Sequence, residues 1–246
     1  MAGQIGQTFM EMTKFGHSRP SDQIKGLSPP PLELPCDPAI PRIDLPRPEN
    51  ISYGDTPLRE AIAGRESVRA YAKTPLSEGE LSYLLWSTQG VKDVFPRSAT
   101  VRTVPSAGAR HALETYILVN RVANLRSGLY RFLASEHRLA VLDTGAGIAA
   151  EMTEACLGQD MVKRSAVTFI WTAVPYRMTW RYGERGYRYL HLDAGHVCQN
   201  LYLAAQAIDS GVCAIGAFSD DDMNRLLGLD GTEQFVIYLA AVGKKI

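Results

Sequence analysis

Three residues of one short segment, Arg65, Ser67 and Arg69, have the types and spacing to hold a phosphate group. The two arginines flank the serine directly after Gly64, a residue expected to end a helix. Arginine binds phosphate oxygens through two parallel hydrogen bonds, so a turn that brings both guanidiniums to one side would form an anion site. A solvated basic turn explains the same residues equally well when they are taken alone.

Two glycine-containing segments have the composition to bring their backbone close to a flat ligand. Residues 105–108 read Pro-Ser-Ala-Gly between a polar loop and a strand, and glycine has no side chain to obstruct an approach. Gly216 and Ala217 end a short apolar run before Ser219, which is expected to cap a helix. Their amides are therefore candidates to face a ligand acceptor. An ordinary turn is the alternative for both segments.

A further segment, residues 180–189, interleaves aromatic residues with arginines, as a platform for single-stranded nucleic acid would. The whole chain has 26 basic and 26 acidic residues, however, and a formal net charge of zero. A nucleic-acid partner calls for a basic excess on one face. We therefore expect no nucleic-acid partner and interpret the segment as a helix surface that packs against a partner subunit.

Signatures of several common site types are absent from the sequence. No GxGxxG follows a strand, and neither GxxxxGK[ST] nor GxSxG occurs. His191 and His196 are five residues apart, which places them on different faces of a helix. The four cysteines, at positions 36, 156, 198 and 213, are too scattered for a disulfide framework or a paired zinc motif. We expect no metal site, and free thiols in a reducing compartment.

Hydropathy argues against a membrane protein. The longest apolar stretches, 166–174 and 235–242, are much shorter than the roughly 20 residues that a bilayer requires. The first twenty residues lack the apolar segment that follows a basic start in a secretory signal. These observations predict no membrane association and a cytoplasmic location.

Proline sets the front of the chain apart, since ten of the fourteen prolines lie within the first 57 residues. Proline fixes its own backbone and lacks a donor, which excludes a helix or a central strand there. The segment is a disordered tail, a ligand for a proline-recognising domain, or an arm that wraps along the domain. The apolar residues Ile40, Ile43 and Leu45 favour the arm. We assign residues 1–55 to this extension and 56–246 to one folded domain.

The folded domain alternates between helical and strand patterns. Thr56 and Pro57 start a helix that Gly64 ends, and a capping box at 77–80 starts a helix that stops at Gly90. Strands are expected at 114–120, 129–132, 138–142, 166–174 and 235–242, and helices at 144–157, through 197–208 up to Gly211, and after Ser219. Locally paired strands followed by strands between long helices favour an α+β fold.

Taken in order, these segments resemble the FMN-dependent nitroreductase family, and in particular its SagB-type dehydrogenase branch. The resemblance spans roughly residues 56–246. It is carried by RESVRAY (65–71), PLSEGEL (75–81) with LLWSTQG (84–90), PSAGA (105–109) with LE (113–114), SGLY (127–130), YRYLHLDAGH (187–196) with QNLYLAA (199–205), and IGAF (215–218). No single string is decisive, but their order and spacing are specific.

The resemblance implies a nitroreductase-like α+β fold with a mixed, mainly antiparallel sheet flanked by helices. It also implies an intertwined homodimer with FMN at each subunit interface. The implied FMN contacts are the phosphate and ribityl ligands Arg65, Ser67 and Arg69 assisted by Lys244, the residues Pro105, Ser106, Ala107 and Gly108 that line the flavin from the neighbouring subunit, and the backbone of Gly216 and Ala217 near the flavin N5 atom.

The activity that the resemblance implies is an FMN-dependent oxidoreduction in two steps. Hydride from NAD(P)H enters at flavin N5 and passes to a small organic acceptor such as a nitro compound or a quinone. No side chain is then required as acid or base, because the cofactor carries the redox chemistry. The alternatives are a non-catalytic flavin-binding protein for storage or sensing, and an azoline-oxidising dehydrogenase of a peptide-modifying system.

The sequence departs from the branch's pattern immediately after residues 105–109. Leu-Tyr-Pro is usual there, whereas this chain has Arg110, His111 and Ala112. One explanation is unconstrained change in a solvent-facing loop. The other is a substrate pocket altered by Arg110 and His111 to favour an anionic or polar acceptor.

Overall fold

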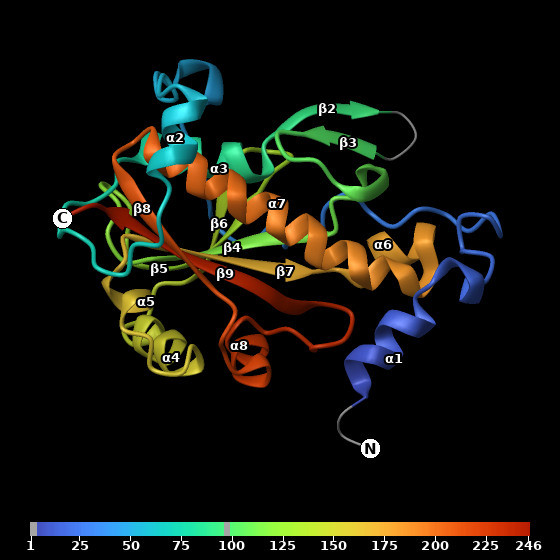
Figure 1. The fold of residues 1–246 in the computed structure, drawn as a ribbon. Coiled ribbons are helices and arrows are strands. Elements are labelled where there is room, and N and C mark those ends of the chain that lie inside the picture. Colours follow the sequence, from blue (N-terminus) through green and yellow to red (C-terminus); the bar gives the residue numbers. More distant parts are fainter. Residues whose placement is uncertain (1–3, 96–98) are drawn as a thin grey trace.

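A seven-stranded antiparallel sheet organises the part of the chain that the computed structural model describes, residues 4–95 and 99–246. Its strand order is β1-β6-β5-β4-β7-β9-β8, and each neighbouring pair is antiparallel (Figure 1). The strands are β1 (Arg42–Asp44), β4 (Leu113–Val119), β5 (Gly128–Leu133), β6 (Arg138–Asp143), β7 (Val167–Ala173), β8 (Ser210–Ile215) and β9 (Phe235–Lys244). A separate hairpin consists of β2 (Val91–Phe95) and β3 (Ala99–Arg102).

Helices cover both faces of the sheet (Figure 1). On one face lie α3 (Glu78–Gln89), α6 (Pro175–Tyr182) and α7 (Gly186–Gln206), and on the other α4 (Ile148–Ala155), α5 (Met161–Arg164) and α8 (Asp220–Leu226). Successive residues of β7 alternate between the two layers: Phe169 and Trp171 pack into the first, and Ile170 into the second. Strands buried on both faces explain why 166–174 is a continuous apolar run.

Two further helices lie outside these layers. They are α1 (Ile5–Met12), near the N-terminus, and α2 (Leu58–Gly64), which contacts α7. The expectation that the front segment contains no helix is wrong for α1, because this helix precedes the first proline, Pro20. Short 3-10 turns occur at Phe15–His17, Pro48–Asn50, Ala107–Ala109 and Gly183–Arg185. Figure 1 shows α1 and the β2–β3 hairpin projecting from the layered body.

The α+β fold class predicted from the sequence is confirmed. An isolated parallel bridge from Ser67 to Val212 makes the otherwise antiparallel sheet mixed at its β8 edge, and a second parallel bridge joins Leu76 to Val122 outside the strands. The capping box is present: Ser77 Oγ accepts a hydrogen bond from the Glu80 amide at 3.1 Å, and Glu80 Oε2 accepts one from the Ser77 amide at 2.9 Å.

Three predicted helix boundaries are wrong. α2 begins at Leu58, with Pro57 as its N-cap. α4 begins at Ile148 rather than near 144, because Gly147 has a φ of +117° that an α-helix excludes. α7 ends at Gln206, and Gly211 lies in β8, where a Cβ atom would come within 2.5 Å of Val68. Gly211 is therefore required by close strand packing and not by a helix end.

A buried ionic cluster fastens the proline-rich segment to the body. Glu114, on β4, is 3% exposed and forms ion pairs with Arg131 of β5 and Arg177 of α6. Its Oε1 also accepts a hydrogen bond from the Leu34 amide at 2.9 Å. The same two arginines donate to the carbonyls of Pro31, Leu34 and Pro35. The arm thus supplies acceptors to guanidiniums that are otherwise shut off from water.

Farther along the arm, backbone pairing continues this attachment. Residues Arg42–Asp44 form the edge strand β1 against β6, and Ser82 Oγ donates to the Pro46 carbonyl at 2.6 Å. These contacts place residues 31–46 along the body, and of the three interpretations we propose the bound arm for this part of the proline-rich segment. Opposite charges strengthen the attachment of the arm at Glu114. Burial alone raises the pKa of Glu114, but Arg177, Arg131 and the Leu34 amide outweigh burial and hold that pKa below its usual value.

We predict that Glu114→Gln releases the arm. Two buried guanidiniums then lose their counter-charge, a change that typically costs about 3–5 kcal/mol. Tryptic cleavage after Arg42, followed by mass spectrometry, should accelerate strongly, and the unfolding midpoint should fall. Asp222→Asn is the control, because its ion pair with Arg225 is exposed and worth about 0–1 kcal/mol. Equal cleavage rates in Glu114→Gln and wild type would contradict the prediction.

Candidate functional site

Arg65 and Ser67 lie beside the C-terminal part of α7. Ser67 Oγ is 3.0 Å from the Tyr202 hydroxyl, which also accepts a hydrogen bond from the Ala214 amide of β8 at 3.0 Å. The guanidinium carbon of Arg65 is 5.4 Å from the centroid of the Tyr202 ring, within the range of a cation–π contact. Tyr202 therefore connects the basic segment to both α7 and the sheet edge.

The sheet edge fixes this segment because its backbone pairs with β8. The Val68 amide donates to the Val212 carbonyl at 2.9 Å, which places Arg69 next to Cys213. Burial raises the pKa of the Cys213 thiol, and Arg69 is close enough to oppose that rise. Arg65 is half-buried and Arg69 exposed, so both charges are available to a ligand from solvent.

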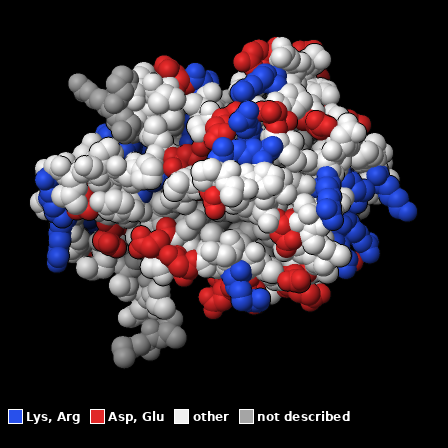
Figure 2. All heavy atoms as spheres, turned by 180° about the vertical axis from the view of Figure 1, so that it is seen from behind, with Lys and Arg blue, Asp and Glu red and all other residues white. Residues whose placement is uncertain are grey.

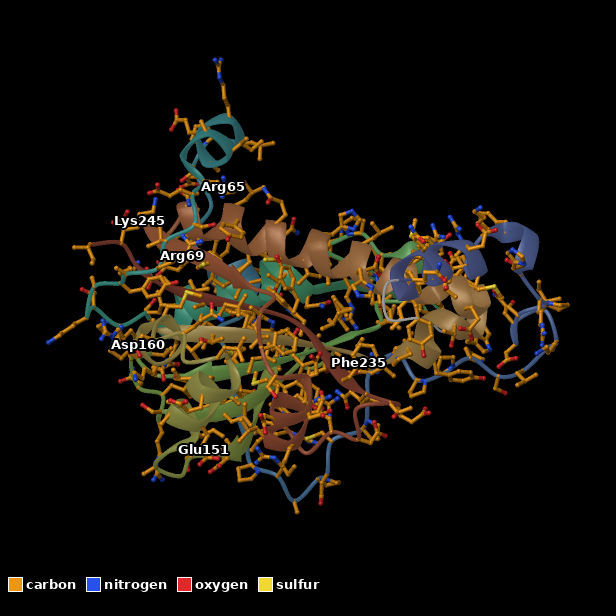
Figure 3. All side chains as sticks on the ribbon, turned by 60° about the horizontal axis from the view of Figure 1, so that its bottom comes forward. Arg65, Arg69, Glu151, Asp160, Phe235 and Lys245 are labelled. Atoms are coloured by element: carbon orange, nitrogen blue, oxygen red, sulfur yellow. The ribbon has the colours of Figure 1, made fainter. Side chains whose placement is uncertain are left out.

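The two C-terminal lysines have different surroundings. Lys244 Nζ forms an ion pair with Glu80 and donates to the Ile208 carbonyl, so its charge is already compensated. Lys245 Nζ donates to Gln206 Oε1 at 2.9 Å, and a Cβ on Gly64 would lie 3.4 Å from the same oxygen. Figure 3 shows Arg65, Arg69 and Lys245 at the same end of the molecule. Lys245 thus joins the arginines, while Lys244 is held by an acidic partner.

The segment 105–111 forms a tight turn against α6 and α7. The Ala107 amide donates to Asp193 Oδ1 at 3.2 Å, and the His111 amide donates to Ser106 Oγ at 2.8 Å. Gly108 has a φ of +59°, and a Cβ atom there would meet the Tyr182 hydroxyl at 2.4 Å. A side chain at this position would have to displace Tyr182 or Arg181 and adopt a left-handed conformation that glycine favours.

Arg110 and His111 are buried within their own chain, at 7% and 6% exposure, so the explanation of a solvent-facing loop is wrong. The Arg110 guanidinium lies 5.3 Å from the Trp180 ring centroid, and its Nε donates to the Gly108 carbonyl. Burial, assisted by Arg102, lowers the pKa of His111 to about 3. Both side chains are thus buried under the turn at residues 105–111 and support it.

Gly216 and Ala217 lie at the end of β8 and are exposed. A Cβ atom at Gly216 would meet open space, and the Ala217 carbonyl accepts a hydrogen bond from Gln159 Nε2 at 2.8 Å. This backbone is therefore open to a ligand.

Within one chain the basic cluster and the turn stay apart. Asp193 and Tyr202 anchor them on the same helix, nine residues apart, which is roughly 14 Å along the helix axis. The structure brings together Arg65, Ser67, Arg69 and the end of β8, and it places residues 105–108 toward the other end of α7. A ligand that touches both regions must therefore be long or lie between two chains.

Sequence reasoning missed three residues of this region: Tyr202, Asp193 and Lys245. Tyr202 and Asp193 contact residues 135 and 86 positions away, so no local pattern could reveal their partners. Lys244 and Lys245 are adjacent at the end of β9, so alternation along a strand places their side chains on opposite sides. This alternation was the signal that could have separated the two lysines.

Charge is mixed over the surface on the far side of the view in Figure 1. Figure 2 shows acidic and basic side chains interspersed over that face, with basic ones grouped near its edges. In the described ranges, no group of three or more His, Cys, Asp or Glu residues could hold a metal ion. No helix among the described residues is long and apolar enough to span a membrane.

Comparison with known proteins identifies the family. The model of the nitroreductase family matches residues 62–244. A protein of Methanocaldococcus jannaschii that carries a nitroreductase name is 35% identical over 205 residues, which are 83% of this chain and 96% of that protein. The chain therefore belongs to the nitroreductase family, as its sequence motifs indicated.

Other relatives are longer or more distant. The trifolitoxin-processing protein TfxB of Rhizobium leguminosarum bv. trifolii is 31% identical over 140 residues, 55% of this chain and 32% of that protein. A crystal structure from Anabaena variabilis, described as a nitroreductase, has a TM-score of 0.68 and 30% identity, covering 85% of this chain and 42% of that one. A structure from Desulfovibrio desulfuricans, solved with FMN, shares the fold at 17% identity and a TM-score of 0.54, covering 77% and 87%.

The buried imidazole of His111 predicts a pH dependence of stability. Its pKa is about 3 in the folded protein and 6.5 in an unstructured chain, so below pH 6.5 the unfolded state alone gains the proton. Stability is then lost as pH falls, by about 2 kcal/mol at pH 5.

His111→Asn removes this titration, and asparagine tolerates the positive φ of 42° found there. Urea unfolding between pH 7.5 and 5 should show a flatter stability profile in this variant than in wild type. His191→Asn is the control, since that side chain is exposed. Parallel profiles for wild type and His111→Asn would refute the assignment.

Proposed function

We propose that the protein is an FMN-dependent oxidoreductase that uses NAD(P)H and reduces a small organic acceptor. The observation that carries this proposal is the cluster of Arg65, Arg69 and Lys245 beside the Ser67 hydroxyl, in a chain that belongs to the nitroreductase family. Bound FMN would supply hydride transfer between the nicotinamide and a nitro compound, a quinone or a related acceptor.

The residues of this chain fit such a cofactor. The exposed and half-buried arginines present forked donors to a phosphate, and Ser67 Oγ adds a hydroxyl. Lys244 was expected to assist; its ion pair with Glu80 supports a role in holding the end of β9, and Lys245 is better placed as the third cation. The open backbone of Gly216 and Ala217 is the proposed donor toward flavin N5.

A homodimer would complete the site. The basic cluster and the turn at 105–108 lie at opposite ends of the anchoring stretch of α7, so a second chain can supply the turn to the first chain's phosphate site. Leu58 and Ile62 on α2 and Leu192 on α7 are more than half exposed, which suits a covered interface. We place FMN at each of the two interfaces of this proposed dimer.

The cysteines, the surface charge and the buried Arg110 and His111 support three further assignments. All four cysteines are free, which fits a reducing, cytoplasmic location. The mixed surface charge and the small site favour a small-molecule substrate over nucleic acid. Because Arg110 and His111 are buried behind the turn, we propose that they affect the acceptor through the position of that turn.

A second candidate is an azoline-oxidising dehydrogenase of the SagB-type branch. It is favoured by the likeness to a trifolitoxin-processing protein, although this chain spans about a third of that protein. A peptide-modifying role needs a partner that presents the peptide. A non-catalytic flavin-binding protein is the third possibility.

Absorbance of the purified protein separates these functions. FMN bound to an NAD(P)H oxidoreductase should lose its visible absorbance within seconds of anaerobic NADH or NADPH addition, and a quinone or nitro compound should restore it. Flavin that stays coloured indicates a non-catalytic binder. Oxidation of an azoline peptide, but of no NAD(P)H, indicates the peptide-modifying enzyme. A colourless protein that ignores added FMN refutes the proposal.

We predict that Arg65→Ala weakens FMN binding. Loss of one charge-assisted hydrogen-bonding group costs about 1.5–3 kcal/mol, which is roughly ten- to a hundredfold in affinity. Fluorescence titration of the apoprotein with FMN measures this change. Arg126→Ala, at an exposed position away from the cluster, should bind FMN as wild type does. Unchanged affinity in Arg65→Ala would show that the phosphate lies elsewhere.

A further inference from the structure

We infer that Asp193 is a positioning residue for the flavin: its carboxylate fixes the turn at 105–111 in the conformation that faces FMN, and it does so for the cofactor held by the partner subunit. This inference rests on the proposed function. It assigns a role to a buried acidic side chain that touches neither the basic cluster nor the proposed N5 donor.

A chain of hydrogen bonds leads from α7 into the turn. Asp193 Oδ1 accepts from the Ala107 amide at 3.2 Å, and the Ser106 side chain lies close enough to the same carboxylate to lower its pKa. Ser106 Oγ in turn accepts from the His111 amide at 2.8 Å. One carboxylate thus holds Ala107 directly and lies next to Ser106, which holds His111.

The turn needs such an anchor because its backbone is strained. Ala109 and His111 have φ angles of +53° and +42°, in a region that residues with a side chain rarely adopt. A residue of this kind destabilises the chain and persists only where its surroundings hold it in place. The restraints on the turn include the Asp193 contacts on one side and the stacking of Arg110 on Trp180 on the other.

The cost of burying Asp193 indicates that it is retained for this contact. The side chain is 4% exposed, and its Oδ2 is buried without a hydrogen-bond partner among the described residues. Burial raises the pKa of Asp193, and the hydrogen bonds from Ser106 and Ala107 oppose that rise only in part. A core that needed only packing at this position would be better served by an apolar side chain.

The first experiment compares Asp193→Ala with Asp193→Asn. The amide oxygen of asparagine can still accept from the Ala107 amide and lie next to Ser106, so this variant should bind FMN within about threefold of wild type. Asp193→Ala loses both contacts, and we expect at least tenfold weaker FMN binding. We also expect the visible absorption bands of its bound flavin to shift toward those of free FMN.

A purely structural role gives a different pattern. Both variants would then unfold at lower temperature, while the FMN dissociation constant and the flavin spectrum stay as in wild type; that result overturns the inference. Amide hydrogen exchange of the apoprotein at 105–111 provides a readout without FMN, and Asp193→Ala should exchange faster there. Failure of the wild-type protein to bind FMN overturns the proposed function, and is seen before any variant is made.

The second experiment tests action across subunits. Arg65→Ala and Asp193→Ala chains are co-expressed with different affinity tags, and mixed dimers are isolated by tandem purification. If the turn serves the partner's cofactor, one of the two sites carries both substitutions and the other carries neither.

Mixed dimers should then bind one FMN per two chains with wild-type affinity, although dimers of either variant alone bind weakly. If Asp193 acts on its own chain's cofactor, both sites of the mixed dimer carry one substitution, and no high-affinity FMN is found. That outcome would overturn the assignment in trans.

Discussion

The buried charge of Glu114 determines how the parts of this molecule are placed relative to one another. Its carboxylate pairs with Arg131 and Arg177 on two different elements, and a third buried arginine, Arg102, lies near enough for Glu114 to raise its pKa against the opposing effect of burial. Charged groups removed from water are tolerated only when their partners and hydrogen bonds are in place. β4, β5, α6 and the arm must therefore assemble together or leave charges unpaired.

The ionic cluster around Glu114 also contacts the strained turn at residues 105–111. Arg177 donates to the His111 carbonyl at 3.5 Å while it pairs with Glu114, so the end of the turn and the start of β4 are tied to α6. α6 in turn carries Trp180, on which Arg110 stacks. The unusual Arg110-His111 pair thus belongs to a rigid support built from the same helix. We therefore propose that the departure at Arg110 and His111 acts on the substrate pocket through the support of the turn.

Much of the fold was predictable because its signals are local. The capping box at Ser77, the apolar run of β7 and the hairpin of β5 and β6 each follow from residues close together in sequence. Boundaries that depend on distant contacts were not predictable: the sequence predicts a helix end at Gly211, but its role is to let Val68 approach β8. The basic segment at 65–69 was recognised by its composition, whereas its anchor, Tyr202, comes from a helix 135 residues away.

The basic cluster and the turn at residues 105–108, which form the two halves of the proposed site, are separated along α7. Each half is fixed within its own chain, by Tyr202 at one end and by Asp193 at the other, before any partner is present. In the proposed dimer, association would align two rigid surfaces without ordering two loops, which would reduce the entropy lost on forming the site. The folding of each chain would offset the strain in its own turn. The binding energy of a cofactor between the two chains would then be left for selecting its orientation.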